Sequence, residues 1–168
     1  DNNPPPAFST IVLHQEHIIG LTGTDNTVYH SKRFRPESFP TGNQLDIGSR
    51  GDTLAQIFSI SGVLYVYGRQ YVYAVEGGPD SATWVWRKLD ATASIGTKPA
   101  SSSSAIRTLA LGRRAIYYLG PDGIYALNGL SATNITDAKL YPLFHGETVN
   151  GFSPINRTWL NRSVGVFF

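Results

Sequence analysis

Four histidines are the residues best suited to acid–base or metal chemistry in this sequence, because it contains no cysteine. His14 and His17 are three residues apart in a segment typical of β-strands, where such a pair points to opposite faces. A zinc site would therefore need His30 and His145 to converge on this segment from elsewhere in the chain. Ordinary surface or interface histidines are the simpler interpretation, and we expect no metal.

The acidic residues form no recognisable catalytic pattern. Glycosidase chemistry needs two converging carboxylates. None of the five candidates lies in a catalytic motif: Glu16, Glu37, Asp46, Asp52 and Glu76. Asp52, directly after Gly51, is typical of an Asx turn that bonds to its local backbone. Asp25-Asn26 and Asp122-Gly123 are turn sequences without the alternating acidic residues of a calcium loop. The chain also has no G-x-S-x-G elbow and no phosphate-binding glycine loop, so we expect no enzymatic activity and no cofactor.

The basic residues offer a candidate binding surface. Lys32, Arg33 and Arg35 form a cluster, while Arg50 and the pair Arg113–Arg114 lie elsewhere in the sequence. Phosphate contact or docking onto an acidic partner is one interpretation. We favour a solvated loop and a charged β-turn, since charge near a turn also protects a sheet edge from unwanted pairing. The net charge of +2 is too small to indicate nucleic-acid binding by overall charge.

Tyrosines alternate along two segments of the chain. The positions are Tyr65, Tyr67, Tyr71 and Tyr73 in the first segment and Tyr117 and Tyr125 in the second. We expect each row to share one face of a sheet. An exposed row could stack on sugar rings, whereas a buried row would fill the space between sheets. The matching positions in the two segments favour packing.

An internal repeat carries these residues. Ile116–Leu119 and Ile124–Leu127 predict an antiparallel hairpin around the turn Gly120-Pro121-Asp122-Gly123. Residues 55–77 show almost the same pattern as residues 107–129, without a gap and 52 residues earlier. Repeated units of several strands are typical of propeller blades or a comparable β-array. We therefore predict an all-β fold of antiparallel, β-propeller-like blades.

Turn signals divide the chain into an extended lead-in and four units. Consecutive prolines favour an extended start, and we see no strong helix, with only Thr133–Leu140 able to form a short one. A propeller has roughly 4–8 blades, so we expect a partial propeller or a fragment of one. The absence of methionine suggests a processed product, a fragment or an excised region. The lead-in spans 1–7, and the units span about 8–50, 51–96, 97–150 and, for the start of another, 151–168.

Composition agrees with a sheet-rich protein that is partly covered by neighbours. Charged residues make up 15% of the chain, against roughly 25% in typical globular domains. The chain has 17 glycines and nine tyrosines, and no apolar run approaches the ~18–20 residues that span a bilayer.

Several segments, in this order, resemble β-propeller structural proteins of tailed bacteriophages, of the tail-hub, nozzle and head-stabilisation type. That group carries a "VYxSxxxxPExFP" segment, a "GDxIxxLxxxxxxLxVF" strand pair and an "SPDGIYxxxG" hairpin with an "IS…I…LF" tail. The corresponding residues here are Val28-Tyr29 with Ser31, Pro36–Pro40, Gly51-Asp52, Leu64–Tyr67, Gly120–Gly129 and Ile135–Phe144.

The resemblance implies a non-enzymatic virion protein of the tail or neck. Its partners would be copies of itself in a ring and adjoining tail or portal-adaptor proteins, close to DNA in a channel and without a membrane. We expect contacts in the loops Lys32–Arg50 and Thr97–Ser104, since loops on rigid sheets carry binding. The candidate interface residues are Lys32, Arg33, Arg35, Phe39, Arg50, Arg113 and Arg114.

Two other functions remain open. A carbohydrate-binding or glycan-processing propeller, such as a receptor-binding module, would need exposed aromatics beside carboxylates in one concavity. A secreted repeat protein would use the three glycosylation sequons at Asn134, Asn156 and Asn161.

Overall fold

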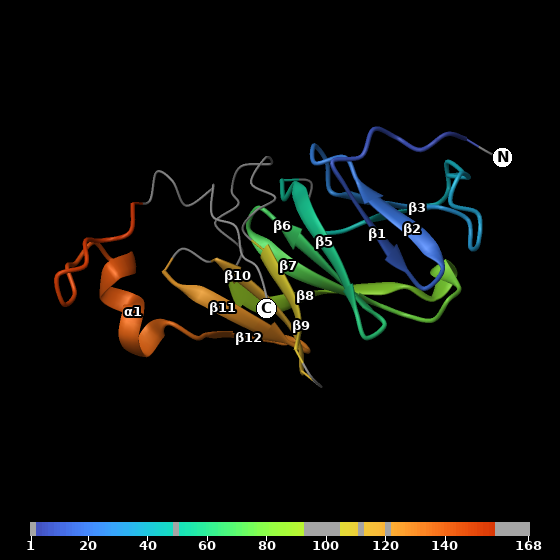
Figure 1. The fold of residues 1–168 in the computed structure, drawn as a ribbon. Coiled ribbons are helices and arrows are strands. Elements are labelled where there is room, and N and C mark those ends of the chain that lie inside the picture. Colours follow the sequence, from blue (N-terminus) through green and yellow to red (C-terminus); the bar gives the residue numbers. More distant parts are fainter. Residues whose placement is uncertain (1–2, 49–50, 93–104, 111–112, 120–121, 157–168) are drawn as a thin grey trace.

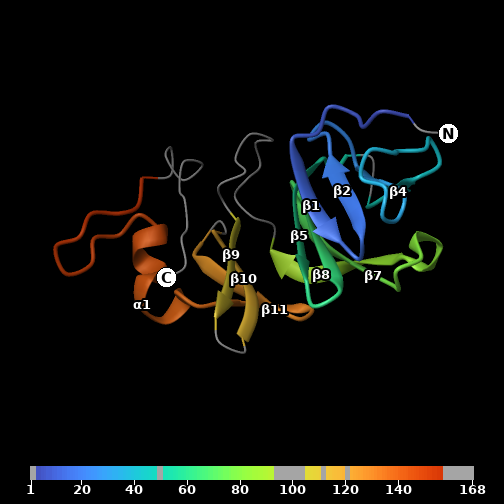
Figure 2. The same cartoon turned by 45° about the vertical axis from the view of Figure 1, so that its right-hand side comes forward.

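The fold was analysed in a computed structural model, which describes residues 3–48, 51–92, 105–110, 113–119 and 122–156. Within these residues, twelve strands form three antiparallel four-stranded groups in chain order, and one α-helix follows them (Figure 1). Figures 1 and 2 both place the helix at the end of the molecule opposite the first sheet. The all-β class is therefore confirmed. The described strands do not close into a ring.

The first sheet has strand order β1-β2-β3-β4, and a two-residue turn sets the register of β1 and β2. Gln15 and Glu16 join β1 to β2 with positive φ values of 44° and 68°. Such values belong to type I′ turns, whose twist matches that of the flanking strands. β4 lies inside the segment expected to be one long loop. The strands are β1 Thr10–His14, β2 His17–Leu21, β3 Thr27–His30 and β4 Gln44–Asp46.

The second and third sheets repeat one pairing register. Leu64 pairs with Val75 on β6 and β7, and Ile116 pairs with Leu127 on β10 and β11, 52 residues later. The predicted hairpin and the internal repeat are thus confirmed at the level of strand pairing. One parallel bridge, Ser131 to Asp90, joins the two groups. The second group is β5 Leu54–Ile60, β6 Val63–Gly68, β7 Tyr71–Glu76 and β8 Val85–Thr92, and the third is β9 Ala105–Ala110, β10 Arg113–Leu119, β11 Ile124–Asn128 and β12 Ser131–Asn134.

The second sheet is buried on both faces. One face packs on the first sheet, in a cluster that includes Leu64, Val66 and Val75 of the second sheet with Ile19 and Val28 of the first. The opposite face packs on the third sheet in a second cluster, which contains Tyr65, Tyr67, Val72, Ile116, Tyr118 and Leu127. Alternation along each strand produces this arrangement, because successive side chains point to opposite faces. The three sheets therefore form a stack.

The expectation that each tyrosine row shares a face is wrong. Tyr67 pairs with Val72, so Tyr65 and Tyr67 lie on the face toward the third sheet, whereas Tyr73 lies on the face toward the first. Tyr125 pairs with Tyr118 and stacks on it at 5.4 Å between ring centroids, which puts it on the face opposite Tyr117. The predicted packing role is nevertheless confirmed for Tyr65, Tyr67 and Tyr73, which are at most 5% exposed.

The described residues contain one α-helix, α1 (Asp137–Phe144), whereas the only short helix considered from the sequence, Thr133–Leu140, lies about one turn earlier. The β-branched residues Ile135 and Thr136 precede this helix. Ala138 to Leu140 are good helix formers, and Asp137 suits the positive end of the helix dipole. Phe144 then packs on Leu119 of β10. Among the described residues no helix is long and apolar enough to cross a membrane.

Candidate functional site

Three histidines meet where the first sheet packs on the second. The two-residue turn makes His14 and His17 directly opposed partners in the register of β1 and β2, so both side chains lie on one face. The expectation of opposite faces is therefore wrong, because it treated the segment as one continuous strand. His30 on β3 pairs with Ile19 and joins the same face. All three are at most 5% exposed, so they are not surface residues.

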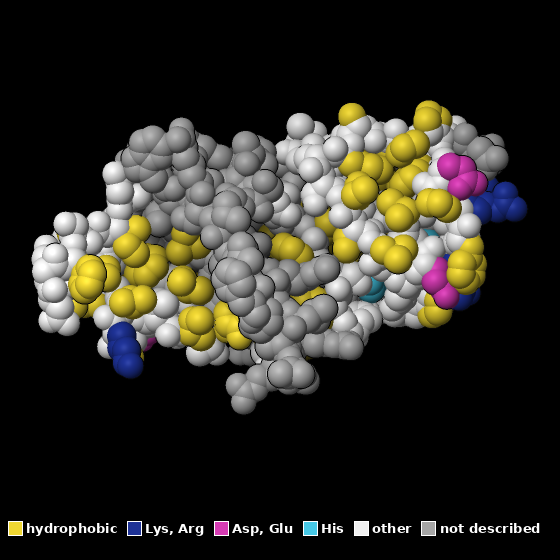
Figure 3. Space-filling view, in the orientation of Figure 1, with side chains coloured by type: hydrophobic (Ala, Val, Ile, Leu, Met, Phe, Trp, Pro, Cys, Tyr) yellow, Lys and Arg dark blue, Asp and Glu magenta, His cyan; other side chains and the backbone are white. Residues whose placement is uncertain are grey.

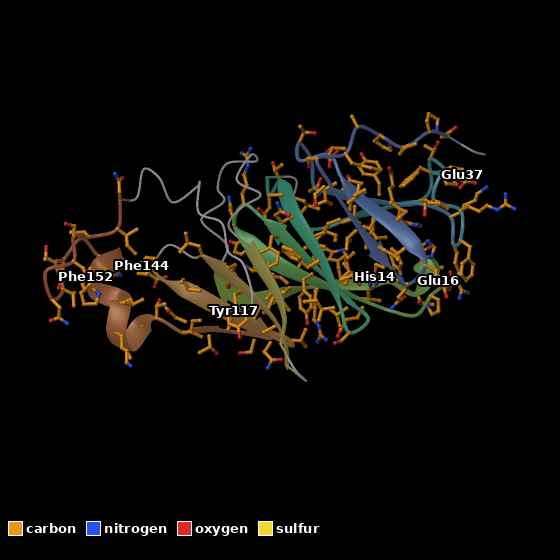
Figure 4. All side chains as sticks on the ribbon, in the orientation of Figure 1. His14, Glu16, Glu37, Tyr117, Phe144 and Phe152 are labelled. Atoms are coloured by element: carbon orange, nitrogen blue, oxygen red, sulfur yellow. The ribbon has the colours of Figure 1, made fainter. Side chains whose placement is uncertain are left out.

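Trp84 is the centre of this histidine cluster. Its ring centroid lies 5.6 Å from that of His14, 5.3 Å from His17 and 5.0 Å from His30. The indole N–H donates to the Gly78 carbonyl at 2.9 Å, so its polar end is satisfied while its rings fill the junction. Trp84 follows the short 3₁₀ turn Ser81–Thr83, which directs the chain into β8. Figure 4 shows His14 near the junction and Glu16 at the end of the hairpin.

Ring nitrogens of all three histidines make structural contacts, whereas His14 Nε2 is buried with no hydrogen-bond partner. His14 Nδ1 lies 2.9 Å from Ser59 Oγ on β5, which joins the first two sheets. His17 Nδ1 lies 2.7 Å from the Ser31 carbonyl and its Nε2 3.0 Å from the Pro79 carbonyl. Carbonyl oxygens only accept, so only the doubly protonated ring of His17 donates to both.

Burial lowers the pKa of His14 and of His30. Desolvation, reinforced by the charge of His17, lowers the pKa of His14 to about 4. Desolvation likewise lowers the pKa of His30, against a hydrogen bond to the Ser31 carbonyl that raises it. Among the described residues, no three His, Asp or Glu side chains are placed to hold a metal ion. His145 lies apart from the cluster, exposed and stacked on Tyr141.

The basic cluster of the sequence forms a tight turn beside these histidines. Lys32 and Arg35 are bridged across it, and Phe34 between them has a positive φ of 57°. Arg33 forms an ion pair with Glu16, and its guanidinium carbon lies 4.9 Å from the ring centroid of Phe34. Because both charged groups are substantially exposed, this pair contributes little to stability.

A hollow of about 330 Å³ lies next to this turn. Its lining combines the edge of one buried histidine with two cations and polar groups: His17, Lys32, Arg33, Asn43, Pro79, Asp80 and Ser81. The polar and charged side chains that line this hollow can contact a polar group on the surface of another molecule. Its single carboxylate, Asp80, caps the neighbouring 3₁₀ turn through Ala82 N–H, so it is committed to local structure.

The remaining candidate interface residues are scattered. Phe39 is 6% exposed and packs against Phe8 at 5.3 Å between ring centroids, so it supports the loop from beneath. Arg35 is exposed on the basic turn. Arg113 and Arg114 begin β10 on the third sheet, away from that turn. Arg50 and the segment Thr97–Ser104 lie outside the described residues. The structure thus brings together only Lys32, Arg33 and Arg35.

Asp52 has a structural role that the sequence did not reveal. It is fully buried and accepts from Gln70 N–H at 2.8 Å and from the Tyr73 hydroxyl at 2.7 Å. The expectation of an Asx turn is therefore wrong, because both donors come from the β6–β7 hairpin rather than from the local backbone. Gly68 leaves room for this carboxylate, since a Cβ there would lie 2.4 Å from Asp52 Oδ2.

The other candidate carboxylates do not converge on Asp52. Glu16 pairs with Arg33, Glu76 pairs with Arg87, and Asp46 accepts from Thr27. Sequence reasoning missed the central place of Trp84 and the cross-sheet contact of Ser59, for which no local motif exists. No protein-family profile matches the chain, and comparison with curated proteins found no match.

Proposed function

We propose that this chain is a non-enzymatic structural protein of a phage tail or neck, acting as a hub, nozzle or adaptor. Its sheets would be β-propeller-like blades that assemble with copies of the chain and with neighbouring tail proteins around the DNA conduit. One observation carries the structural half of this proposal: the second sheet is apolar on both faces and buried between the sheets before and after it. Successive blades of a propeller pack in this way.

Two further features support an assembly role. The ionisable residues most suited to catalysis are occupied by structural contacts, as His14 with Ser59 and Asp52 with Tyr73 illustrate. The phage assignment rests on the ordered resemblance of the sequence segments. No observation favours the carbohydrate-binding alternative, because Tyr65, Tyr67 and Tyr73 are packed between sheets instead of forming a platform for sugar rings.

Purified particles from the source material test the proposal. We expect peptides of this chain to co-purify with virions through a density gradient, at several copies per particle by quantitative mass spectrometry. The copy number should stay constant after high-salt washing, because permanent interfaces are more hydrophobic than transient ones and salt screens mainly exposed charges. Absence of the chain from intact particles would refute the proposed function.

A further inference from the structure

The stack of sheets has a direction. The second sheet meets the first through one face, which we call its leading face: Leu64, Val66, Tyr73 and Val75. The third sheet packs on the opposite face of the second sheet, which we call its trailing face: Tyr65, Tyr67, Val72 and Ala74. The third sheet contributes to that junction the 52-residue counterparts of the leading face: Ile116, Tyr118, Tyr125 and Leu127. At both junctions, therefore, a sheet packs through its leading face on the sheet that precedes it in the chain, and the residues involved are equivalent in the 52-residue repeat.

One end of the stack presents an apolar face that nothing in the described chain covers completely. Ile11 and Leu13 on β1 are 62% and 65% exposed, because they alternate with the inward-facing Val12 and His14. Leu13 pairs with Ile18 across the hairpin. Hydrophobic side chains gather over β1 and β2 (Figure 3). Over β1 to β3 the outer face of the first sheet consists of Phe8, Ile11, Leu13, Ile18 and Tyr29, with no charged residue among them. The edge strand β4 adds the exposed Gln44 and Asp46 to the same face, so the apolar part lies over β1 and β2.

The other end presents the counterpart of a trailing face. Tyr117, Leu119, Ile124 and Ala126 occupy the positions equivalent to the trailing face of the second sheet. Phe144 of α1 and Ile155 pack against Leu119 and Ile124 at one end of this face. Tyr117 and Ala126, which are paired across β10 and β11, are only half-buried.

We propose that the outer face of the first sheet docks on the trailing face of the third sheet in a second copy of this chain. The interface continues the packing that already joins the sheets within the chain, sheet face on sheet face in one direction. A second copy is the fitting partner, because both internal junctions are made by sheets of this same sequence. Contacts between two different patches are heterologous, and they close into a ring when the rotation between copies permits. This inference rests on the proposed function in one respect, which is that copies of the chain assemble with one another.

The direction of the contact allows a complementation test with two variants. Leu13→Lys places a charge on the outer face, and Tyr117→Lys places one on the trailing face. We expect wild-type chain to associate in sedimentation velocity, and each variant alone to associate about tenfold or more weakly. An equimolar mixture should recover dimers, because the intact outer face of one variant meets the intact trailing face of the other. Val85→Lys is the matched control, since Val85 is a strand residue that is 69% exposed, and it should behave as wild type.

The alternatives give distinct results. A symmetric dimer through two outer faces would leave Tyr117→Lys fully associated and give no recovery on mixing, and this would overturn the inference. Wild-type chain that stays monomeric would also overturn it, even if particles contain the chain, in which case the proposed function would stand. Thermal unfolding identifies any variant that fails to fold, and Ala126→Lys on the same face then replaces Tyr117→Lys.

Discussion

The buried histidine His14 should make the protein less stable in mild acid. Its pKa is about 4 in the folded chain, against about 6.5 in an unfolded one. The unfolded state therefore takes up the proton first as the pH falls. The contribution of His14 to the free energy of unfolding is fully present above about pH 6.5 and decreases progressively down to about pH 4. The difference between the folded and unfolded pKa of His14 corresponds to about 3 kcal/mol of stability, of which about 2 kcal/mol is lost by about pH 5.

A matched pair of variants isolates this effect. His14→Gln removes the titrating group but keeps a side chain able to reach Ser59, whereas His145→Gln removes an exposed histidine. Urea denaturation gives the free energy of unfolding of each at about pH 8 and about pH 5. We expect His14→Gln to lose about 2 kcal/mol less than wild type between these values, and His145→Gln to match wild type. An unchanged pH dependence in His14→Gln would refute the burial argument.

Two further substitutions test the local packing. Tyr73→Phe removes the hydroxyl that donates to the buried Asp52 carboxylate, and we expect urea denaturation to show a loss of about 1.5–3 kcal/mol; a loss below about 0.5 kcal/mol would mean that the carboxylate is otherwise satisfied. Gly123→Ala places a Cβ 2.4 Å from Thr136 Oγ1, which accepts from the next backbone N–H of the hairpin. We expect it to lower stability by about 1–3 kcal/mol, whereas Gly42→Ala, where a Cβ meets open space, should change little. Equal effects of the two alanines would contradict the steric argument.

The sequence predicted the strands and the repeat because these depend on local signals. Apolar alternation and turn residues were enough to place the hairpin of β10 and β11 and its counterpart 52 residues earlier. What it could not predict is which residues share a face across a turn. Tyr67 pairs with Val72, and directly paired residues share a face. Because an even number of residues separates these partners, odd-numbered residues lie on one face of the sheet before the turn and on the other face after it. Two residues, also an even number, separate His14 from His17 and bring them opposite each other.

The candidate site was less predictable, since its contacts join distant segments. Trp84 contacts histidines from three strands of the first sheet, and nothing in its neighbourhood along the chain indicates this. Asp52 is bound by donors that lie 18 and 21 residues further along the chain. The turn containing Lys32 and Arg33 was recognised as a basic cluster from its composition alone, but its ion pair with Glu16 depends on the adjacent hairpin.

Stacking connects these details to the proposed role. The histidine cluster and the tyrosine-rich cluster each fill one junction between sheets, and both junctions are closed by side chains that alternate along strands. Few charged residues are needed in such a protein, because much of its surface faces another sheet. An assembly of copies would extend the same packing beyond one chain.

Cryo-electron microscopy of the native particle tests the central claim most directly. The account predicts a symmetric ring of this chain around a DNA-sized channel, in contact with other virion proteins and with the outer face of the first sheet covered. A chain found as a soluble monomer, with a closed propeller and an open ligand pocket, would contradict it.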